Sequence, residues 1–211
     1  MRWRSSRRRT GQAQSANPTS RRAFHVILIK PTRYDDDGYP VHWTRSPLPS
    51  NALACMYGIV EDCRRRHVLG QDVEIAITAV DESNRRIDVD RLARGMQRSE
   101  GRGLVCMVGV QSNQFPRAVD LARRFRAAGL EVCVGGFHVS GCVAMLDDLT
   151  PELEAAQSDG ISLFAGEAEE QRLDQVLRDA YAGTLKPLYD YTGKAPTLEG
   201  QPLPLLPAEN V

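Results

Sequence analysis

The chain has 211 residues and a formal net charge of zero, with 27 basic and 27 acidic side chains. Apolar residues make up 42% and charged residues 26%, which excludes wholesale disorder, and the neutral balance excludes a uniformly basic nucleic-acid binder. No apolar run reaches the ~18 residues of a membrane span, and the length suits one domain that buries a core without disulfides or metal.

Positive charge is concentrated at the N-terminus. Residues 1–22 contain seven arginines and no acidic residue, so the remainder carries a net charge of −7. The segment Thr10–Ser20 is polar, which excludes a secretory signal, and it lacks the amphipathic face of a transit peptide. We therefore expect residues 1–23 to form a disordered leader; a nucleic-acid or membrane-surface tail is the weaker alternative.

The five cysteines form an odd number and include no CxxC pair. Cys106 and Cys133 lie in apolar runs typical of buried strands, where Cys behaves as a small hydrophobe. Without a secretory signal, this usage predicts a cytoplasmic protein with no disulfide framework. Zinc ligands at the usual spacing are absent, and His138 and Cys142, which would be neighbours on a helix, do not by themselves define a metal site.

Short apolar runs alternate with amphipathic segments from residue 24 onward. In chain order they predict strand His25–Pro31, helix Ser50–Leu69, strand Asp72–Val80, helix Val89–Arg98, strand Leu104–Val110 and helix Pro116–Ala128. Strand Glu131–Gly135, helix Val143–Gln157 with a break near Pro151, strand Ile161–Ala165 and helix Glu167–Ala182 follow.

Five successive β–α units predict a three-layer, Rossmann-like α/β domain of the flavodoxin type over residues 24–185. We expect a five-stranded parallel sheet with helices on both faces, because each crossover covers the sheet. Residues 186–211 are rich in proline and lack periodicity, which predicts an extended linker toward a further domain.

Ligands of open α/β sheets bind at the carboxyl ends of the strands, which directs attention to the loops there. Gly135 and Gly136 end the fourth strand and remove side chains where a bulky group approaches the backbone. A bulky residue in place of Gly136 is therefore expected to remove a ligand and preserve the fold. Polar or small residues in the same loops are Ser112, Asn113, Gln114, His138, Ser140, Gly166 and Glu167.

Each of these loops also has a purely structural interpretation. The glycine pair suits a tight turn, the polar residues after the third strand can cap a helix, and Glu167 favours a helix N-terminus electrostatically. The motifs GxGxxG, GxxxxGK[ST] and GxSxG are absent, which excludes a dinucleotide fingerprint, a P-loop and a nucleophile elbow. A phosphorylation receiver would need a lysine in the loop directly after the fifth strand, and that loop contains none.

The polar loop after the third strand, GGFHVS at residues 135–140 and AGEAEE at residues 165–170 together resemble the N-terminal cobalamin (B12)-binding domain of radical S-adenosylmethionine proteins. The resemblance covers roughly residues 24–205. It implies that the strand ends face the corrin ring and that the nucleotide tail runs beside the fourth strand. It implies cofactor contacts from Ser112, Asn113, Gln114, Gly135, Gly136, Phe137, His138, Ser140, Gly166 and Glu167.

This sequence departs from that family in two places. The CxxxCxxC motif of the family's following domain is missing, so no iron–sulfur cluster is expected in this chain. We expect a fragment or stand-alone module beside the radical domain or subunit of a bacterial enzyme, with no catalytic residues of its own. The DxHxxG motif after the first strand is also missing, so no histidine ligand to cobalt is expected.

Two other classes of function remain open. One is a degenerate flavodoxin-like interaction module without a cofactor, which would dock through the loop containing Trp43. The other is an enzyme that uses another small nucleotide-like ligand, although no group of residues identifies its reaction.

Overall fold

The computed structural model describes residues 22–43, 50–97, 102–193, 195–197 and 199–207. The predicted Arg-rich leader, apart from Arg22 and Ala23, lies outside these residues. Within the described ranges, no helix combines the length and the apolar character that crossing a membrane requires.

The strands are β1 (Arg22–Lys30), β2 (Val73–Asp81), β3 (Gly103–Met107), β4 (Glu131–Gly135), β5 (Ser162–Ala165) and β6 (Leu188–Asp190). The helices are α1 (Asn51–Arg65), α2 (Val89–Gln97), α3 (Phe115–Ala127), α4 (Phe137–Met145), α5 (Pro151–Ser158) and α6 (Arg172–Ala182). All five predicted strands and the helices between them are present.

The strands form one open sheet in the order β2-β1-β3-β4-β5-β6, and every neighbouring pair is parallel. The predicted α/β class with a parallel sheet is confirmed, and the architecture is broadly Rossmann-like. The order along the sheet reverses between β1 and β3, so the chain leaves these two strands in opposite directions across the sheet.

The expectation of five strands is wrong, because β6 extends the sheet. Leu188, Tyr189 and Asp190 pair with the last residues of β5. The Tyr189 ring is almost fully buried, and its hydroxyl donates to the Asp179 carboxylate at 2.8 Å. Because the strand is three residues long and follows Pro187, its sequence carries too short a pattern to stand out from the predicted linker.

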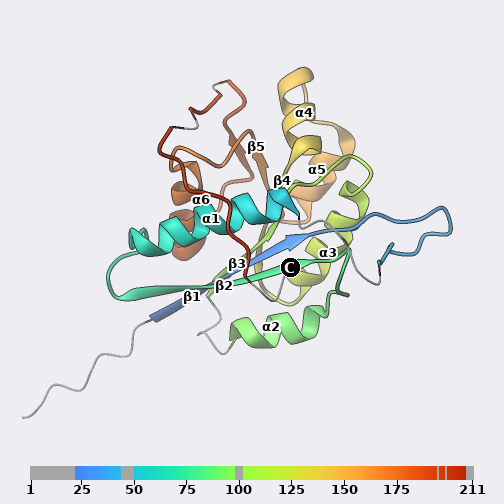
Figure 1. Ribbon diagram of the computed structural model, residues 1–211. Helices are drawn as coiled ribbons and strands as arrows, with labels where there is room; N and C mark the ends of the chain where they lie inside the picture. Colours follow the sequence, from blue (N-terminus) through green and yellow to red (C-terminus); the bar gives the residue numbers. More distant parts are fainter. Residues whose placement is uncertain (1–21, 44–49, 98–101, 194, 198, 208–211) are drawn as a thin grey trace, which may run out of the picture.

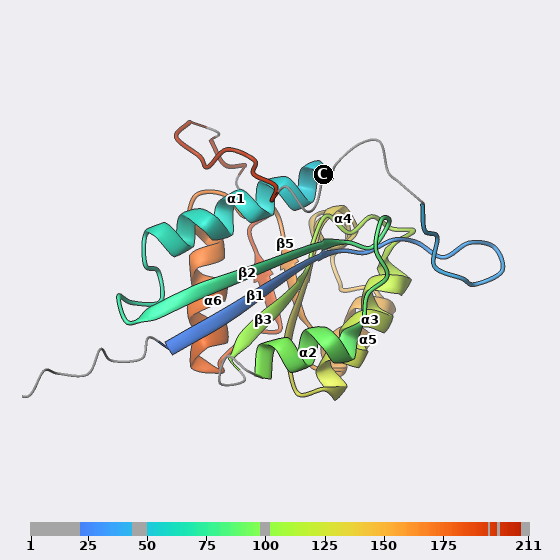
Figure 2. The same ribbon diagram turned by 60° about the horizontal axis from the view of Figure 1, so that its bottom comes forward.

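The sheet separates two apolar cores (Figures 1 and 2). One core packs α1 and α6 against one face, and the other packs α2, α3, α4 and α5 against the opposite face. Successive side chains of β1 point to opposite faces of the sheet, so Val26 and Leu28 enter the first core while Ile27 and Ile29 enter the second. The central strand β3 is buried throughout, as its continuous apolar run predicts.

Two helix ends follow their sequence signals. The Ser50 hydroxyl accepts the backbone N–H of Leu53 at 3.2 Å and caps α1. Gly183 ends α6 in the left-handed conformation at φ 71°. The start of α4 departs from expectation, because the helix begins at Phe137 instead of Val143. The predicted break near Pro151 is present, since a separate helix, α5, begins there.

The segment after β6 turns back over α1 (Figure 1). The Leu205 N–H donates to the Ala54 carbonyl of α1 at 3.0 Å. A side chain at Gly58 would overlap the backbone of Leu203, so this helical glycine permits the close crossing. Part of the predicted linker is therefore packed against the domain.

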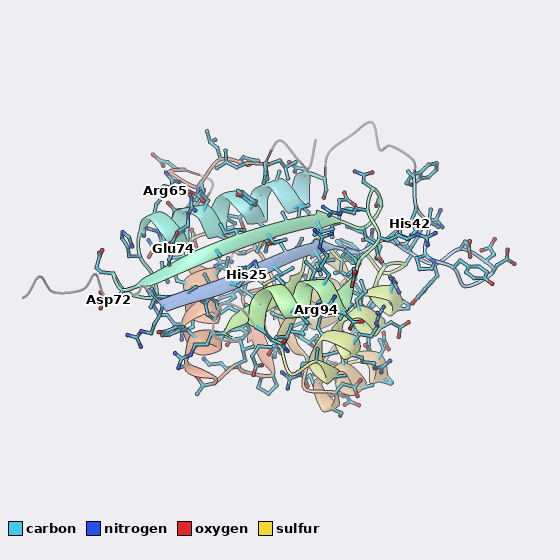
Figure 3. All side chains as sticks on the ribbon, turned by 90° about the horizontal axis from the view of Figure 1, so that it is seen from below. His25, His42, Arg65, Asp72, Glu74 and Arg94 are labelled. Carbon is cyan, nitrogen blue, oxygen red and sulfur yellow. The ribbon has the colours of Figure 1, made fainter. Side chains whose placement is uncertain are left out.

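The opposite face is less completely covered at β2. Figure 3 shows His25 on β1 above α2 and His42 far from it, in the loop after β1. The His25 Nε2 lies 2.8 Å from the Thr78 hydroxyl of β2, and both residues line a hollow of about 340 Å³ beside α2. Burial lowers the pKa of His25, which keeps the imidazole neutral at physiological pH.

Candidate functional site

An apolar cavity of about 200 Å³ lies at the carboxyl ends of β3, β4 and β5, on the side covered by α1 and α6. Its walls are mostly aliphatic, and Glu167 and Glu169 are the acidic residues among them. The α1 wall is Ala52, Cys55, Met56 and Ile59; the sheet and its loops supply Cys106, Met107, Val108, Gly109, Cys133, Gly135, Gly136, Phe164, Gly166 and Ala168; and α6 supplies Leu173 and Val176.

The cavity has the size of an aromatic group. An apolar cavity of roughly 150 Å³ holds benzene in another protein, so this one has room for a larger, flat apolar ring. It lies next to the reversal between β1 and β3, the place where ligands of open α/β sheets bind. A macrocycle would not fit inside and would have to lie over the strand ends.

Thiols form part of the cavity wall. Cys106 and Cys133 are register partners on β3 and β4 and are each 5% exposed. Burial raises the pKa of Cys133 to about 12, and burial followed by the neighbouring Cys133 raises that of Cys106. Both therefore remain protonated and behave as apolar wall atoms. Cys55 is half-buried, and burial followed by the charge of Glu169 raises its pKa.

Gly136 is required by the backbone. Its φ of 142° and ψ of −170° belong to a region that only glycine populates readily. A side chain there would overlap the backbone of Val110, whose N–H donates to the Gly135 carbonyl at 3.2 Å and whose carbonyl accepts the His138 N–H at 3.0 Å. A side chain at Gly136 therefore strains this turn, so the expected loss of ligand would be accompanied by a loss of stability.

The structure divides the predicted site residues between the two faces of the sheet. Gly135, Gly136, Gly166 and Glu167 border the apolar cavity. Ser112 and His138 lie on the other side, in a hollow of about 390 Å³ between α3 and α5. Ser140 joins α4 to the loop after β5, because its hydroxyl accepts the Gly166 N–H at 2.9 Å.

The remaining predicted residues lie on the rim. The Gln114 side-chain carbonyl accepts the Gln111 N–H at 3.0 Å and so closes the turn before α3. Gln114 is the N-cap residue of α3, but its side chain does not make the cap hydrogen bond to the helix that the structural interpretation expects of these residues. Asn113 is exposed, and Phe137 is 67% exposed at the first position of α4. An apolar ring this open to solvent is available to contact a ligand or a partner.

His138 belongs to a polar cluster with Cys142 and Glu152. Its Nε2 lies 4.0 Å from the Cys142 Sγ and 3.7 Å from a Glu152 carboxylate oxygen. Its Nδ1 lies 3.2 Å from the Ser112 hydroxyl, and the Phe115 ring packs on the imidazole with ring centres 4.4 Å apart. Burial lowers the pKa of His138, and the nearby Glu152 carboxylate partly offsets that effect.

A buried ion pair holds the loop after β1 in place. Glu82 is fully buried and pairs with Arg117 of α3 at 2.5 Å. The other Glu82 oxygen accepts the Thr32 N–H at 3.0 Å, and the Glu82 carbonyl lies 2.8 Å from Nδ1 of His42. Tyr34 donates to Asp120 of α3 at 2.7 Å. These contacts fix the base of the loop, while Tyr39 and Trp43 are 69% and 62% exposed.

Sequence reasoning missed the α1 and α6 walls of the cavity, the Glu82–Arg117 pair and Glu152. The apolar face of α1 was visible in the helical spacing, so Cys55 and Met56 could have been placed on the sheet side of that helix. No local signal brings Glu152 to His138, because their approach depends on how α5 packs beside α4.

No protein-family model matches the chain, and searches of curated proteins and of solved structures likewise yield no match. Over the described residues, the chain is an α/β protein with one open parallel sheet of six strands.

Proposed function

We propose that this chain is a cobalamin-binding module that serves a radical S-adenosylmethionine domain or subunit. The observation that carries the proposal is the apolar cavity beside β4, at the carboxyl ends of β3, β4 and β5. It lies where the resemblance of GGFHVS and AGEAEE to B12-binding domains puts the nucleotide tail. The domain is then of the flavodoxin type with one added strand, consistent with the strand order.

The residues present fit the two ends of such a ligand. The apolar walls from α1 and α6 suit the benzimidazole base of the tail, whose ring is larger than benzene and flat. The rim suits the corrin, since Phe137 offers an exposed ring and Gln114, Asn113 and Glu167 offer polar groups to its amide side chains.

Cobalamin, when bound, supplies methyl-transfer or one-electron chemistry at cobalt. The residues of this chain bind it, orient it and keep water from the base. His42 and His138 are engaged elsewhere, with Glu82 and with the polar cluster. We therefore propose no histidine ligand to cobalt. The five cysteines are free thiols and none stands in a CxxxCxxC motif, so the proposed iron–sulfur cluster belongs to another domain or chain, in the reducing cytoplasm.

The test is retention of hydroxocobalamin by the purified full chain. The protein is mixed with the cofactor and desalted, and its visible spectrum is recorded. We expect corrin absorbance to stay with the protein. Desalting to a colourless protein would overturn the proposal.

A variant that fills the cavity separates this site from nonspecific binding. Cys55→Phe places a ring at the α1 wall and is expected to abolish retention, because the ring occupies the space of the base. Arg65→Phe adds the same ring to an exposed position of the same helix, away from the cavity, and should retain cofactor like the wild type. Circular dichroism confirms that both variants are folded.

A second candidate function rests on the exposed aromatic residues of the loop after β1. The loop after β1 projects from the domain (Figure 1). Its base is held by the Glu82–Arg117 pair, and Tyr39 and Trp43 on this loop are exposed. Such a presentation suits docking to another protein. A protein that retains no cobalamin but whose sedimentation changes on Trp43→Ser would support this interaction module instead.

A further inference from the structure

We propose that His138, Cys142 and Glu152 form a zinc-binding site, which is independent of the cobalamin cavity. His138 and Cys142 lie one turn apart on α4 and so share one face of that helix, and Glu152 comes from the first turn of α5. Their ligand atoms all lie within 4.8 Å of one another.

The distances from His138 to the other two donors are close to those around a bound metal. Zinc bonds of about 2.3 Å to sulfur and about 2.0 Å to nitrogen or oxygen, in a tetrahedron, place donor atoms roughly 3.3–3.6 Å apart. The distances from His138 Nε2, 4.0 Å to Cys142 and 3.7 Å to Glu152, exceed those values by roughly half an ångström. The Glu152 side chain is half-exposed, so it can move onto an ion without repacking the core.

The surroundings of His138 orient it for this role. Metal-binding histidines usually donate from the ring nitrogen that does not bind the metal, which fixes the tautomer. When Nδ1–H donates to the Ser112 hydroxyl, 3.2 Å away, Nε2 presents its lone pair toward Cys142 and Glu152. The Phe115 ring, packed against the imidazole, holds that orientation.

The donor set favours zinc among common metals. One thiolate, one imidazole and one carboxylate are borderline to soft ligands, which magnesium and calcium do not prefer. On binding, the Cys142 thiol proton passes to solvent and the thiolate bonds to the ion. The hollow between α3 and α5, lined by His138 and Glu152, gives a water molecule access to the fourth position.

The experiment uses the full chain without cobalamin. The protein is stripped with EDTA and titrated with zinc chloride in a calorimeter, and cobalt(II) serves as a spectroscopic substitute. We expect one tight site per chain and a thiolate-to-cobalt charge-transfer band that Cys142→Ser removes. No zinc binding by the wild type, or a charge-transfer band that persists in Cys142→Ser, would overturn the proposal, since the other thiols would then be the ligands.

Two pairs of variants sharpen the assignment. Glu152→Gln should weaken zinc binding more than about 10-fold. Glu154→Gln makes the same change in the first turn of the same helix and should leave zinc binding unchanged. Ser112→Ala removes the partner of Nδ1 and should weaken binding about 10–100-fold, as loss of such outer partners does in other sites. Equal affinities of the two glutamate variants would show that Glu152 only favours the α5 N-terminus.

Discussion

The surroundings of the strand ends differ between the two sides of the sheet: one side has an apolar cavity and the other a polar cluster. On the α1 and α6 side, β3 and β4 present Cys106, Cys133 and a glycine pair to an apolar cavity. On the other side, α4 begins two residues after β4, and its His138 lies beside Ser112 of the loop between β3 and α3.

The length of the connections explains this difference. A long loop separates β1 from α1, so α1 can lie across the sheet and leave space beneath it. The connections from β3 to α3 and from β4 to α4 are shorter, and in the first turns of these helices the Phe115 ring packs on the His138 imidazole. Bulky apolar groups are therefore expected to bind on the first side and small polar ligands or ions on the second.

The polar side should be the more sensitive to loss of one charge. Arg117→Met leaves the fully buried Glu82 carboxylate without its cation, and we expect the free energy of unfolding to fall by about 3–5 kcal/mol. Chemical denaturation followed by circular dichroism measures the change. Arg123→Met is the control, because that arginine pairs with Asp159 on the surface and its loss should cost less than about 1 kcal/mol. An equal fall in the free energy of unfolding for both variants would mean that the burial of Glu82 does not make its ion pair more stabilising than a surface pair.

The boundary between the two sides depends on Gly136. Gly136→Ala should lower the free energy of unfolding by about 1–3 kcal/mol from backbone strain alone, and overlap with Val110 adds to that loss. Gly141→Ala, in the middle of α4 with open space around its position, should instead be neutral or stabilising by up to about 1 kcal/mol. Thermal unfolding of both variants and of the wild type measures these changes in stability. A harmless Gly136→Ala would show that the turn can relax away from Val110.

Features of this protein were predictable from the sequence where a continuous stretch of residues determines them, and not where they depend on packing between distant segments. Strand β3 and helix α1 have patterns of their own, an apolar run and a capped amphipathic segment, and both were predicted. The three-residue β6 has too short a pattern, and its burial comes from Tyr189 packing beside α6.

The division of the site had no local cause either. Gly136 and His138 are two residues apart, yet one borders the cavity and the other faces Glu152. Which side each residue takes depends on the turn of the chain at Gly136 and on where α5 packs. Sequence spacing could identify the loops as important without assigning their residues to a common ligand.

The smallest change in stability that we expect concerns the contact between α6 and the end of α1, on the cavity side of the sheet. Asp174 of α6 accepts two hydrogen bonds from Arg66, at 2.6 and 2.7 Å, and so joins α6 to the end of α1. Burial alone would raise the pKa of Asp174, but the bonds from Arg66 outweigh it and hold the pKa below its usual value. A carboxylate with a lowered pKa in the folded state stabilises the protein above its unfolded pKa of ~3.9, and that stability is lost as the pH falls further.

Unfolding measured from pH 7 down to pH 3 tests this contribution. Asp174→Asn should be less stable than the wild type at pH 7, and the difference should shrink below about pH 4, because the Asp174 carboxylate of the unfolded wild type then binds a proton while the folded protein still holds it ionised. Asp159→Asn, which removes an exposed partner of Arg123, controls for the loss of one surface ion pair. A constant difference between wild type and Asp174→Asn at every pH would mean that packing of the side chain, and not its charge, joins α1 to α6. In that case α1 and α6 would be held together by packing alone. The two sides of the sheet would then differ more strongly, because only the side with the Glu82–Arg117 pair would depend on an ion pair for its stability.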